Sequence, residues 1–122
     1  MGLNDSSNGR DAGVRRGSLF EPAAPCADRE TVELLLERPG ARIERIVSTG
    51  QTTPPGQWYD QSGDEWVALL AGRATLRLED GALVDLSPGD WLLIPARLRH
   101  RVEATSADPP CVWLAVHAVP EP

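Results

Sequence analysis

Several residue types are scarce in this chain, and each scarcity narrows the classes of protein to which it can belong. The 122 residues include no lysine, and the 12 arginines are outnumbered by 18 acidic residues, which gives a net charge of −6. An acidic chain without a basic stripe is poorly suited to nucleic acid or to an anionic membrane surface. No apolar run approaches the roughly 20 residues that a membrane-spanning helix needs. The sequence therefore predicts neither a nucleic-acid partner nor a membrane partner.

Cysteine and histidine are equally scarce, with two residues of each. Cys26 and Cys111 do not form a CxxC pair, which argues against a thiolate zinc site. The first residues, MGLNDSSNGRDAGVRRGS, have no apolar core, so no secretory signal is expected there. Two free thiols without a secretion signal predict a reducing compartment and a cytoplasmic location. Cys111 stands in an apolar run and is expected to be a small core residue.

Composition divides the chain into a polar start, one folded domain and a short end. Residues 1–27 are rich in Gly, Ser, Asn, Asp and Arg and lack hydrophobic periodicity, which predicts a flexible tail. The length allows one domain, which we expect over residues 28–118. Residues 119–122 are then a C-terminal tail.

Helix and strand compete as predictions for the segment Asp28–Glu37. Asp28 is a favourable N-cap residue, and Pro39-Gly40 would end a helix. A strand is the alternative. We favour a short N-terminal helix that precedes the rest of the domain.

The remainder of the domain has the pattern of β-structure. Short apolar or alternating runs are separated by turn signals, and Asp80-Gly81 between two such runs is a strong hairpin signal. No alternation of strand and helix suggests a parallel sheet. About eight short strands at this spacing predict a sandwich or barrel. The expected strands are 43–47, one that starts at 58–59, 65–70, 75–78, 83–86, 91–94, 100–104 and 112–117.

Two stretches within this domain carry residues with chemical potential. Glu65 is followed after six residues by Gly72, while Gly89 is followed by Pro95 and then by His100. A carboxylate and an imidazole therefore stand at the starts of two separate strands, and folding can bring them together. These are the residue types that a metal site or an acid/base site needs.

Quoted together, Glu65-x6-Gly72 and Gly89-x5-Pro95-x4-His100 resemble the two signature motifs of the cupin superfamily. The resemblance covers about residues 30 to 118 and is to the small single-domain cupin-2, or conserved barrel, proteins. It implies an all-β fold, a cupin-type jelly-roll β-barrel, to which our reading of the residues adds the short N-terminal helix and the flexible N-terminal tail. It also implies that Glu65 and His100 match ligand positions of the metal-binding members.

The first motif departs from the family at two ligand positions. The resemblance implies a His-x-His pair shortly before Glu65. In this chain those positions are occupied by Tyr59 and Gln61, or by Trp58 and Asp60, depending on the spacing. Neither alignment places a histidine there.

The second motif departs as well. Arg97 stands where the family usually has a glycine, and Ala104 stands where it usually has an asparagine. Because His100 and His117 are the two histidines of the chain, the three-histidine, one-glutamate ligand set of the family cannot form.

Strand alternation predicts which side chains share the barrel interior. Residues i and i+2 point to one face of a strand, so an inward Glu65 places Val67 and Leu69 inward as well. In the cupin jelly roll that the resemblance implies, the last strand runs back from the strand that carries His100, which brings His117 toward the end of the barrel where His100 begins. The predicted metal ligands are Gln61, Glu65 and His100, and the predicted pocket residues are Tyr59, Trp58 and His117.

This mixed set of nitrogen and oxygen donors suits a divalent transition metal, namely Zn, Fe, Mn, Ni or Co. The alternative is a structural pair in which Glu65 binds His100 or an arginine without a metal, since a buried carboxylate needs a partner. Arg97, Arg99 and Arg101 cluster beside His100, either as a solvated face or as an anion-attracting rim.

Three functions fit these predictions. The first is a metal-dependent enzyme acting on a small metabolite, the second a metal-free binding or sensor module, and the third a metal-free enzyme that uses Glu65 and His100 as an acid/base pair. All three take a small molecule in the barrel. Apolar residues on both faces of the strands 65–70 and 112–116 predict that the outer sheet face is also covered, as in a homodimer.

Overall fold

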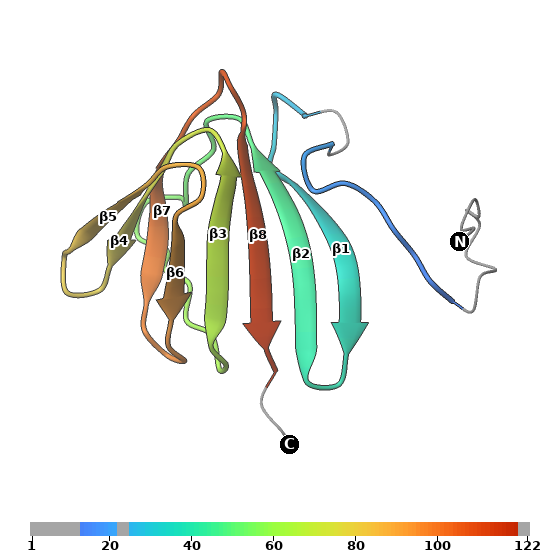
Figure 1. Cartoon of the computed structure of the whole chain (residues 1–122). Helices are drawn as coiled ribbons and strands as arrows, with labels where there is room; N and C mark the ends of the chain where they lie inside the picture. Colours follow the sequence, from blue (N-terminus) through green and yellow to red (C-terminus); the bar gives the residue numbers. More distant parts are fainter. Residues whose placement is uncertain (1–12, 22–24, 120–122) are drawn as a thin grey trace.

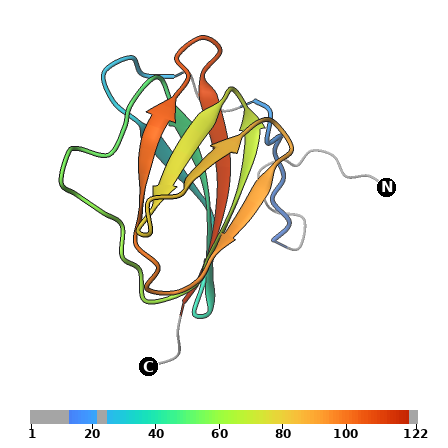
Figure 2. The same cartoon turned by 90° about the vertical axis from the view of Figure 1, so that its left-hand side faces the viewer.

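The computed structural model of the chain describes residues 13–21 and 25–119, which form eight β-strands in two facing antiparallel sheets (Figures 1 and 2). The larger sheet has the order β1-β2-β8-β3-β6 and the smaller sheet the order β5-β4-β7. The prediction of an all-β barrel is confirmed. The strands are β1 Thr31–Arg38, β2 Ala41–Ser48, β3 Glu65–Ala71, β4 Ala74–Leu78, β5 Leu83–Leu86, β6 Trp91–Ile94, β7 His100–Thr105 and β8 Cys111–Ala118.

The core lies between the two sheets and takes apolar side chains from both. Leu69 on β3 and Cys111 on β8 are fully buried, as is expected of a small apolar thiol. Both cysteines are free thiols, and burial, followed by the negative charge of Glu30, raises the pKa of Cys111 to about 12. The core cluster consists of Val67, Leu69, Ala74, Leu76, Leu86, Ile94, Cys111 and Trp113.

The predicted N-terminal helix over Asp28–Glu37 is wrong, because Thr31–Arg38 forms the edge strand β1. Arg38 pairs with Ala41, so Pro39-Gly40 is a two-residue hairpin turn and does not end a helix. The register shifts between Leu34 and Leu36, and this bulge interrupts the alternation that would have identified a strand. Within the described residues there is no helix, and hence none that could cross a membrane.

The predicted strand starting at Trp58 and Tyr59 is also wrong in its extent. The segment between β2 and β3 is a loop, and it contacts β7 through an isolated bridge between Tyr59 and His100. Each of these two residues donates its backbone N–H to the carbonyl of the other, at 2.8 and 3.1 Å. Pro54 and Pro55 lack donors, so this segment cannot form a continuous ladder.

The described part of the predicted N-terminal tail contacts the barrel. Arg15 donates to the carbonyl of Leu35 at 2.9 Å, and Arg45 on β2 donates to the carbonyl of Ser18. The Thr49 hydroxyl donates to the carbonyl of Cys26 at 2.9 Å. Residues 1–12, 22–24 and 120–122 lie outside the described part, so the flexible tail remains a prediction for them.

Gly72, the glycine of the first motif, lies between β3 and β4 at the upper end of the barrel in Figure 1 and is closely surrounded. Its φ of 79° lies in the left-handed region that favours glycine. A Cβ atom on Gly72 would lie 2.5 Å from Oγ of Ser106, 2.7 Å from the carbonyl oxygen of Pro110 and 2.8 Å from Cα of Cys111. The motif glycine is therefore required by close backbone approach.

Candidate functional site

The register of three neighbouring strands places polar side chains in one row at the lower end of the barrel in Figure 1. Glu65 on β3 lies opposite His117 on β8, and His117 lies opposite Arg42 on β2. Two residues further into the barrel, Val67 and Ala115 occupy the equivalent row on β3 and β8. The inner face of the large sheet therefore changes from polar at this end to mostly apolar in the middle.

This polar row lines a cavity of about 260 Å³ between the two sheets. Apolar side chains from both sheets line the rest of the cavity, among them Val67, Leu76 and Trp113. Val32 and Tyr59 also line the cavity and are exposed to solvent, so the cavity opens between the edge strand β1 and the loop that carries Tyr59. The polar lining consists of Glu30, Arg42, Glu44, Tyr59, Gln61, Glu65, His100 and His117.

The structure places five of the six predicted site residues around this one cavity. They are Tyr59, Gln61, Glu65, His100 and His117. The sixth, Trp58, is not part of the lining. The guanidinium groups of Arg99 and Arg101 lie 5.9 and 6.0 Å from its ring centre, so Trp58 packs under arginines at the outside of the loop.

Sequence reasoning missed three charged residues of the lining, Glu30, Arg42 and Glu44. Arg42, Glu44 and Ile46 alternate along β2, which is the pattern of one strand face. That alternation was a usable signal, but charged residues on a strand are normally assigned to the solvent side. The strand pairing with β8 is what assigns them to the inside.

His100 and Glu65 form the central pair of the site. Nε2 of His100 lies 3.4 Å from Oε1 of Glu65, and Nδ1 of His100 lies 3.0 Å from the carbonyl oxygen of Leu98. A carbonyl accepts hydrogen bonds and does not donate them, so Nδ1 carries a proton and a neutral ring would turn a bare Nε2 toward the carboxylate. Burial lowers the pKa of His100, but the contacts with Glu65 and with the Leu98 carbonyl outweigh it, and the net pKa is raised.

The carboxylate of Glu65 is only partly satisfied by this contact. A distance of 3.4 Å exceeds that of a normal N–H···O hydrogen bond, so the pair is an electrostatic contact. Oε1 of Glu65 and Nε of Arg42 are both buried and have no hydrogen-bond partner among the described residues. Both residues line the cavity. Buried polar atoms are normally paired, and Nε of Arg42 still has the Glu44 carboxylate at 3.2 Å, so Oε1 of Glu65 marks the place where an additional polar group would be accommodated.

A second histidine–carboxylate pair lies beside the first. Nε2 of His117 is 3.1 Å from Oε1 of Glu44, and Nε of Arg42 is 3.2 Å from Oε2 of the same carboxylate. Glu44 on β2 thus contacts Arg42 on its own strand and His117 on β8. Glu44 is compensated within the chain, in contrast to Glu65.

Tyr59 forms the wall of the cavity next to His100. Its ring stacks on the imidazole with the ring centres 5.5 Å apart. Burial raises the pKa of the Tyr59 phenol, and so do the negative charges of Glu30 and, to a smaller extent, Glu65, against the opposing effect of a hydrogen bond with Thr53. The phenol therefore stays protonated and lies in a negative environment.

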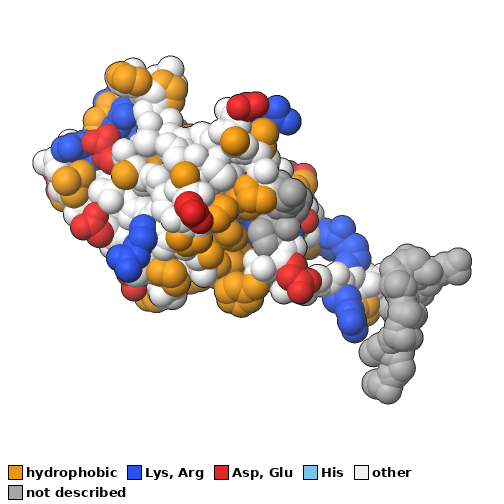
Figure 3. Space-filling model, turned by 90° about the horizontal axis from the view of Figure 1, so that it is seen from above, with side chains coloured by type: hydrophobic (Ala, Val, Ile, Leu, Met, Phe, Trp, Pro, Cys, Tyr) orange, Lys and Arg blue, Asp and Glu red, His pale blue; other side chains and the backbone are white. Residues whose placement is uncertain are grey.

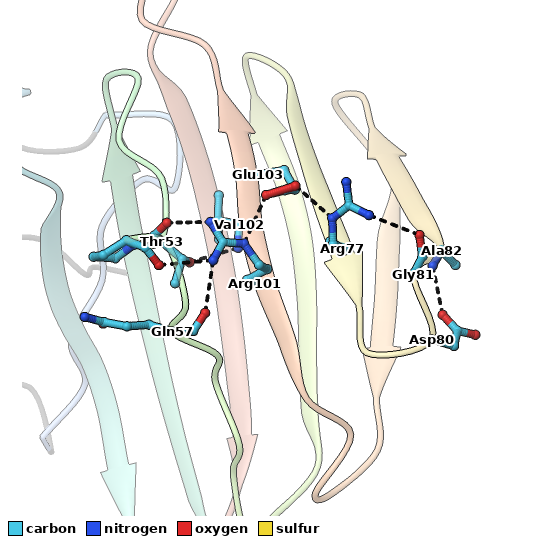
Figure 4. A network of polar contacts seen from close by, with 10 residues as sticks. Thr53, Gln57, Arg77, Asp80, Gly81, Ala82, Arg101, Val102 and Glu103 are labelled. Carbon is cyan, nitrogen blue, oxygen red and sulfur yellow. Dashed lines mark hydrogen bonds and ion pairs between the residues drawn. The ribbon is translucent and has the colours of Figure 1, made fainter.

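The arginines of the second motif fasten the loop that carries Tyr59, and they do not line the cavity. Arg101 donates to the carbonyls of Thr53 at 2.7 Å and of Pro54 and Gln57 at 3.1 Å, and it pairs with Glu103 at 3.0 Å (Figure 4). Arg97 stands at the usual glycine position of the motif. Its φ of 68° lies in the left-handed region that glycine adopts most readily.

The donors around the cavity do not form a complete metal site as they stand. Among residues 13–21 and 25–119, no three His, Cys, Asp or Glu side chains are grouped as a metal ion requires. Gln61 lines the same cavity as Glu65 and His100, but His117 is turned toward Glu44.

Comparison with known proteins agrees with the geometry of the barrel. The sequence matches the cupin domain family over residues 45–117, which is more than half of the chain. The chain is a cupin. The matched region runs from β2 to β8 and contains Glu65, His100 and the row they define. A comparison with curated proteins finds no significant match.

Solved structures show the same cupin barrel. A candidate mannose-6-phosphate isomerase from Ralstonia eutropha JMP134 is 47% identical, with a TM-score of 0.82, and the match covers 86% of this chain and 98% of that one. An RmlC-like cupin from Desulfovibrio desulfuricans is 21% identical, with a TM-score of 0.71 and coverage of 88% and 99%. A protein of unknown function from Streptococcus pyogenes is also 21% identical, with a TM-score of 0.71. The match covers 88% of this chain and 90% of that one. The last two establish the fold alone.

Proposed function

We propose that this cupin binds a small metabolite in the cavity between its sheets, with Glu65 and His100 as the polar anchor. The observation that carries the proposal is the buried Oε1 of Glu65, which lines the cavity without a hydrogen-bond donor. Ligand sites combine a mostly apolar cavity with a few convergent polar groups, and this cavity has both. Leaving such a carboxylate oxygen unpaired costs about 1–3 kcal/mol, which a ligand that donates to it would recover.

The name of the Ralstonia eutropha neighbour suggests a sugar phosphate, but the lining of this cavity offers little to bind a phosphate group. Arg42 is its one guanidinium, and Nε of that group faces the Glu44 carboxylate at 3.2 Å. Phosphate recognition usually employs free Arg or Lys side chains or a helix N-terminus. We therefore propose small-molecule binding without adopting the neighbour's substrate.

Thermal-shift screening of a metabolite collection, with mannose 6-phosphate included, tests the proposal. A ligand of the cavity should raise the melting temperature of the wild type and should lose this effect in Glu65→Gln, which keeps the shape of the side chain but removes its charge. Asp85→Asn, at an exposed position of β5, is the matched control and should respond like the wild type. If every stabilising compound acts equally on Glu65→Gln, the anchor assignment is wrong.

A metal-assisted version of the same site is the second candidate, and the unpaired Oε1 of Glu65 favours it as well. A Zn, Fe, Mn, Ni or Co ion would take Glu65 and His100 as protein ligands, with Gln61 as a third donor, and would act as a Lewis acid. Elemental analysis of protein purified without a histidine tag separates the candidates. A stoichiometric metal that is lost in His100→Ala supports the metal site, and less than about a tenth of an equivalent after reconstitution refutes it.

We also propose that the chain forms a homodimer through the outer face of the large sheet. Trp66 on β3 and Trp91 on β6 stack there with ring centres 6.0 Å apart, and Trp91 and Leu93 are 61% and 52% exposed. Seen from above, hydrophobic side chains gather in the lower half of Figure 3. Exposed aromatic clusters of this kind are typical of interaction surfaces. Light scattering should show a dimer in the wild type and a monomer in Trp91→Glu, and a monomeric wild type would refute this assignment.

A further inference from the structure

The ionisable groups of the cavity are out of balance, and this imbalance bears on the chemical class of the proposed ligand. Three carboxylates, Glu30, Glu44 and Glu65, line the cavity together with one guanidinium, Arg42, and two imidazoles. With both imidazoles neutral, the lining carries a net charge of −2. A cavity with low-dielectric walls and one sign of charge concentrates ligands of the opposite sign.

The unbalanced charge belongs to two of the three carboxylates. Glu44 is compensated, because Arg42 and His117 both contact it. Glu65 contacts His100 alone, at 3.4 Å, and its Oε1 has no hydrogen bond within the described residues. Glu30 at the cavity mouth accepts a hydrogen bond from the neutral Ser48 hydroxyl at 3.1 Å. The negative charge is thus concentrated at the Glu65 side of the cavity and at its mouth.

Tyr59 lies in the field of both of these carboxylates. After burial, Glu30 and Glu65 are the charges that raise the pKa of its phenol. The Tyr59 ring and the indole of Trp113 both line the cavity. Aromatic side chains attract organic cations through the negative face of the ring and repel anions.

The rest of the cavity lining is apolar, which argues for a ligand with a carbon skeleton. Val67, Leu76, Val102 and Ala115 contribute to it from both sheets. A bare metal ion would leave this surface uncovered, whereas an alkyl group buries it at about 25 cal/mol per Å². No three side chains of metal-ligating type gather anywhere in the described ranges, which again favours an organic ion.

We propose that the cavity selects a small organic ammonium compound, with its ammonium group at Glu65 and its carbon skeleton against the apolar lining. This inference rests on the proposed function and specifies the ligand. The ammonium donates to Oε1 of Glu65, the acceptor that the chain itself leaves unpaired. Anionic metabolites are disfavoured because the carboxylates of Glu30 and Glu65 repel them.

An NMR titration of the full-length protein with three matched probes tests the ligand class. Butylamine, butanol and butyrate share a four-carbon skeleton and differ in the charge of the head group. At about pH 8 the amine remains protonated, as a lysine side chain does. We expect butylamine to bind at least about tenfold more tightly than butanol, which corresponds to about 1.4 kcal/mol, and butyrate to bind more weakly still.

Charge-removing variants locate the effect. Glu65→Gln should weaken butylamine binding about tenfold or more and leave butanol binding nearly unchanged. Glu30→Gln should weaken it by a smaller factor, because Glu30 lies at the mouth. Glu21→Gln, which removes the same charge from the exposed segment before β1, should have no effect. A thermal melt of each variant checks that it is folded. If Glu65→Gln does not fold, the Glu30→Gln variant still tests the charge effect.

Each other outcome overturns a defined part of the argument. If butanol or butyrate binds most tightly and depends on Glu65, the ammonium inference fails while the proposed binding site stands. If Zn²⁺ or Mn²⁺ binds in a Glu65-dependent manner and displaces butylamine, the site belongs to a metal, and the ammonium inference fails as well. If no probe and no screened metabolite binds, the proposed function itself fails.

Discussion

The two ends of this barrel satisfy their polar groups in opposite ways. At the upper end, Ser106 accepts a hydrogen bond from the Arg73 backbone N–H at 3.0 Å and donates to the Pro109 carbonyl at 2.7 Å, while Gly72 lets the chains approach closely. At the lower end, Glu65 and Arg42 retain buried atoms without a hydrogen bond from the described chain. The comparison teaches that close packing closes the upper end, whereas the lower, more open end keeps polar atoms that a further group could satisfy.

The largest expected effect is on the closed end, in Gly72→Ala. The added Cβ would meet backbone atoms of Pro110 and Cys111 below 3.0 Å at a φ that disfavours side chains. Backbone strain and overpacking together should lower the free energy of unfolding by about 3 kcal/mol, measured by urea denaturation. Gly81→Ala is the control, since its φ is 94° but nothing lies within 4 Å of the added atom. Equal losses in the two variants would show that close packing at Gly72 is unimportant.

A smaller effect is expected from loosening the wall of the open end. Arg101→Leu removes the side chain that donates to the carbonyls of Thr53, Pro54 and Gln57. The bonds to Pro54 and Gln57 are exposed and these carbonyls can turn to water, so we expect a loss of about 1 kcal/mol in unfolding free energy. The free energy of ligand binding should fall by more than the free energy of unfolding, because the same loop carries Tyr59.

Arg77→Leu is the matched control for this loop. Arg77 also pairs with Glu103, at 2.8 Å, but it donates to the hairpin at Gly81 and does not contact the loop (Figure 4). It should therefore leave ligand affinity unchanged. If both variants weaken binding alike, Arg101 does not act by positioning the loop.

The smallest effect is the pH dependence contributed by His100. Its pKa is raised in the folded state, so its stabilising contribution is complete below the unfolded pKa of about 6.5 and is lost as the pH rises through the higher folded value. Unfolding free energies measured from about pH 5.5 upward should show this decline in the wild type. In Glu65→Gln the opposing effect of burial remains, so the decline should shrink or reverse. An unchanged decline would mean that Glu65 does not set the pKa of His100.

Short-range patterns were enough to predict most of the barrel and the centre of its site. The Asp80-Gly81 hairpin connects β4 and β5 as expected, and the two motifs placed Glu65 and His100 at the same end of the barrel. Both predictions depend on local sequence or on a known motif spacing. Neither required knowledge of how distant strands pair.

The remaining features depend on pairing that local sequence does not encode. β1 was predicted as a helix because a bulge hides its alternation and because its partner β2 is what makes Pro39-Gly40 a hairpin. Arg42 and Glu44 were missed because only the register with β8 turns that face of β2 inward. Tertiary contacts override local propensity in both cases.

The row of Glu65, His117 and Arg42 has a consequence for how the specificity of such a barrel can diverge. Each of the three side chains comes from a different strand, and their neighbourhood is fixed by main-chain hydrogen bonds that do not depend on side-chain identity. A single exchange at any of these positions changes the charge or size of the cavity lining while the ladders stay intact. The lining can thus change one strand at a time, without the rebuilding of a loop.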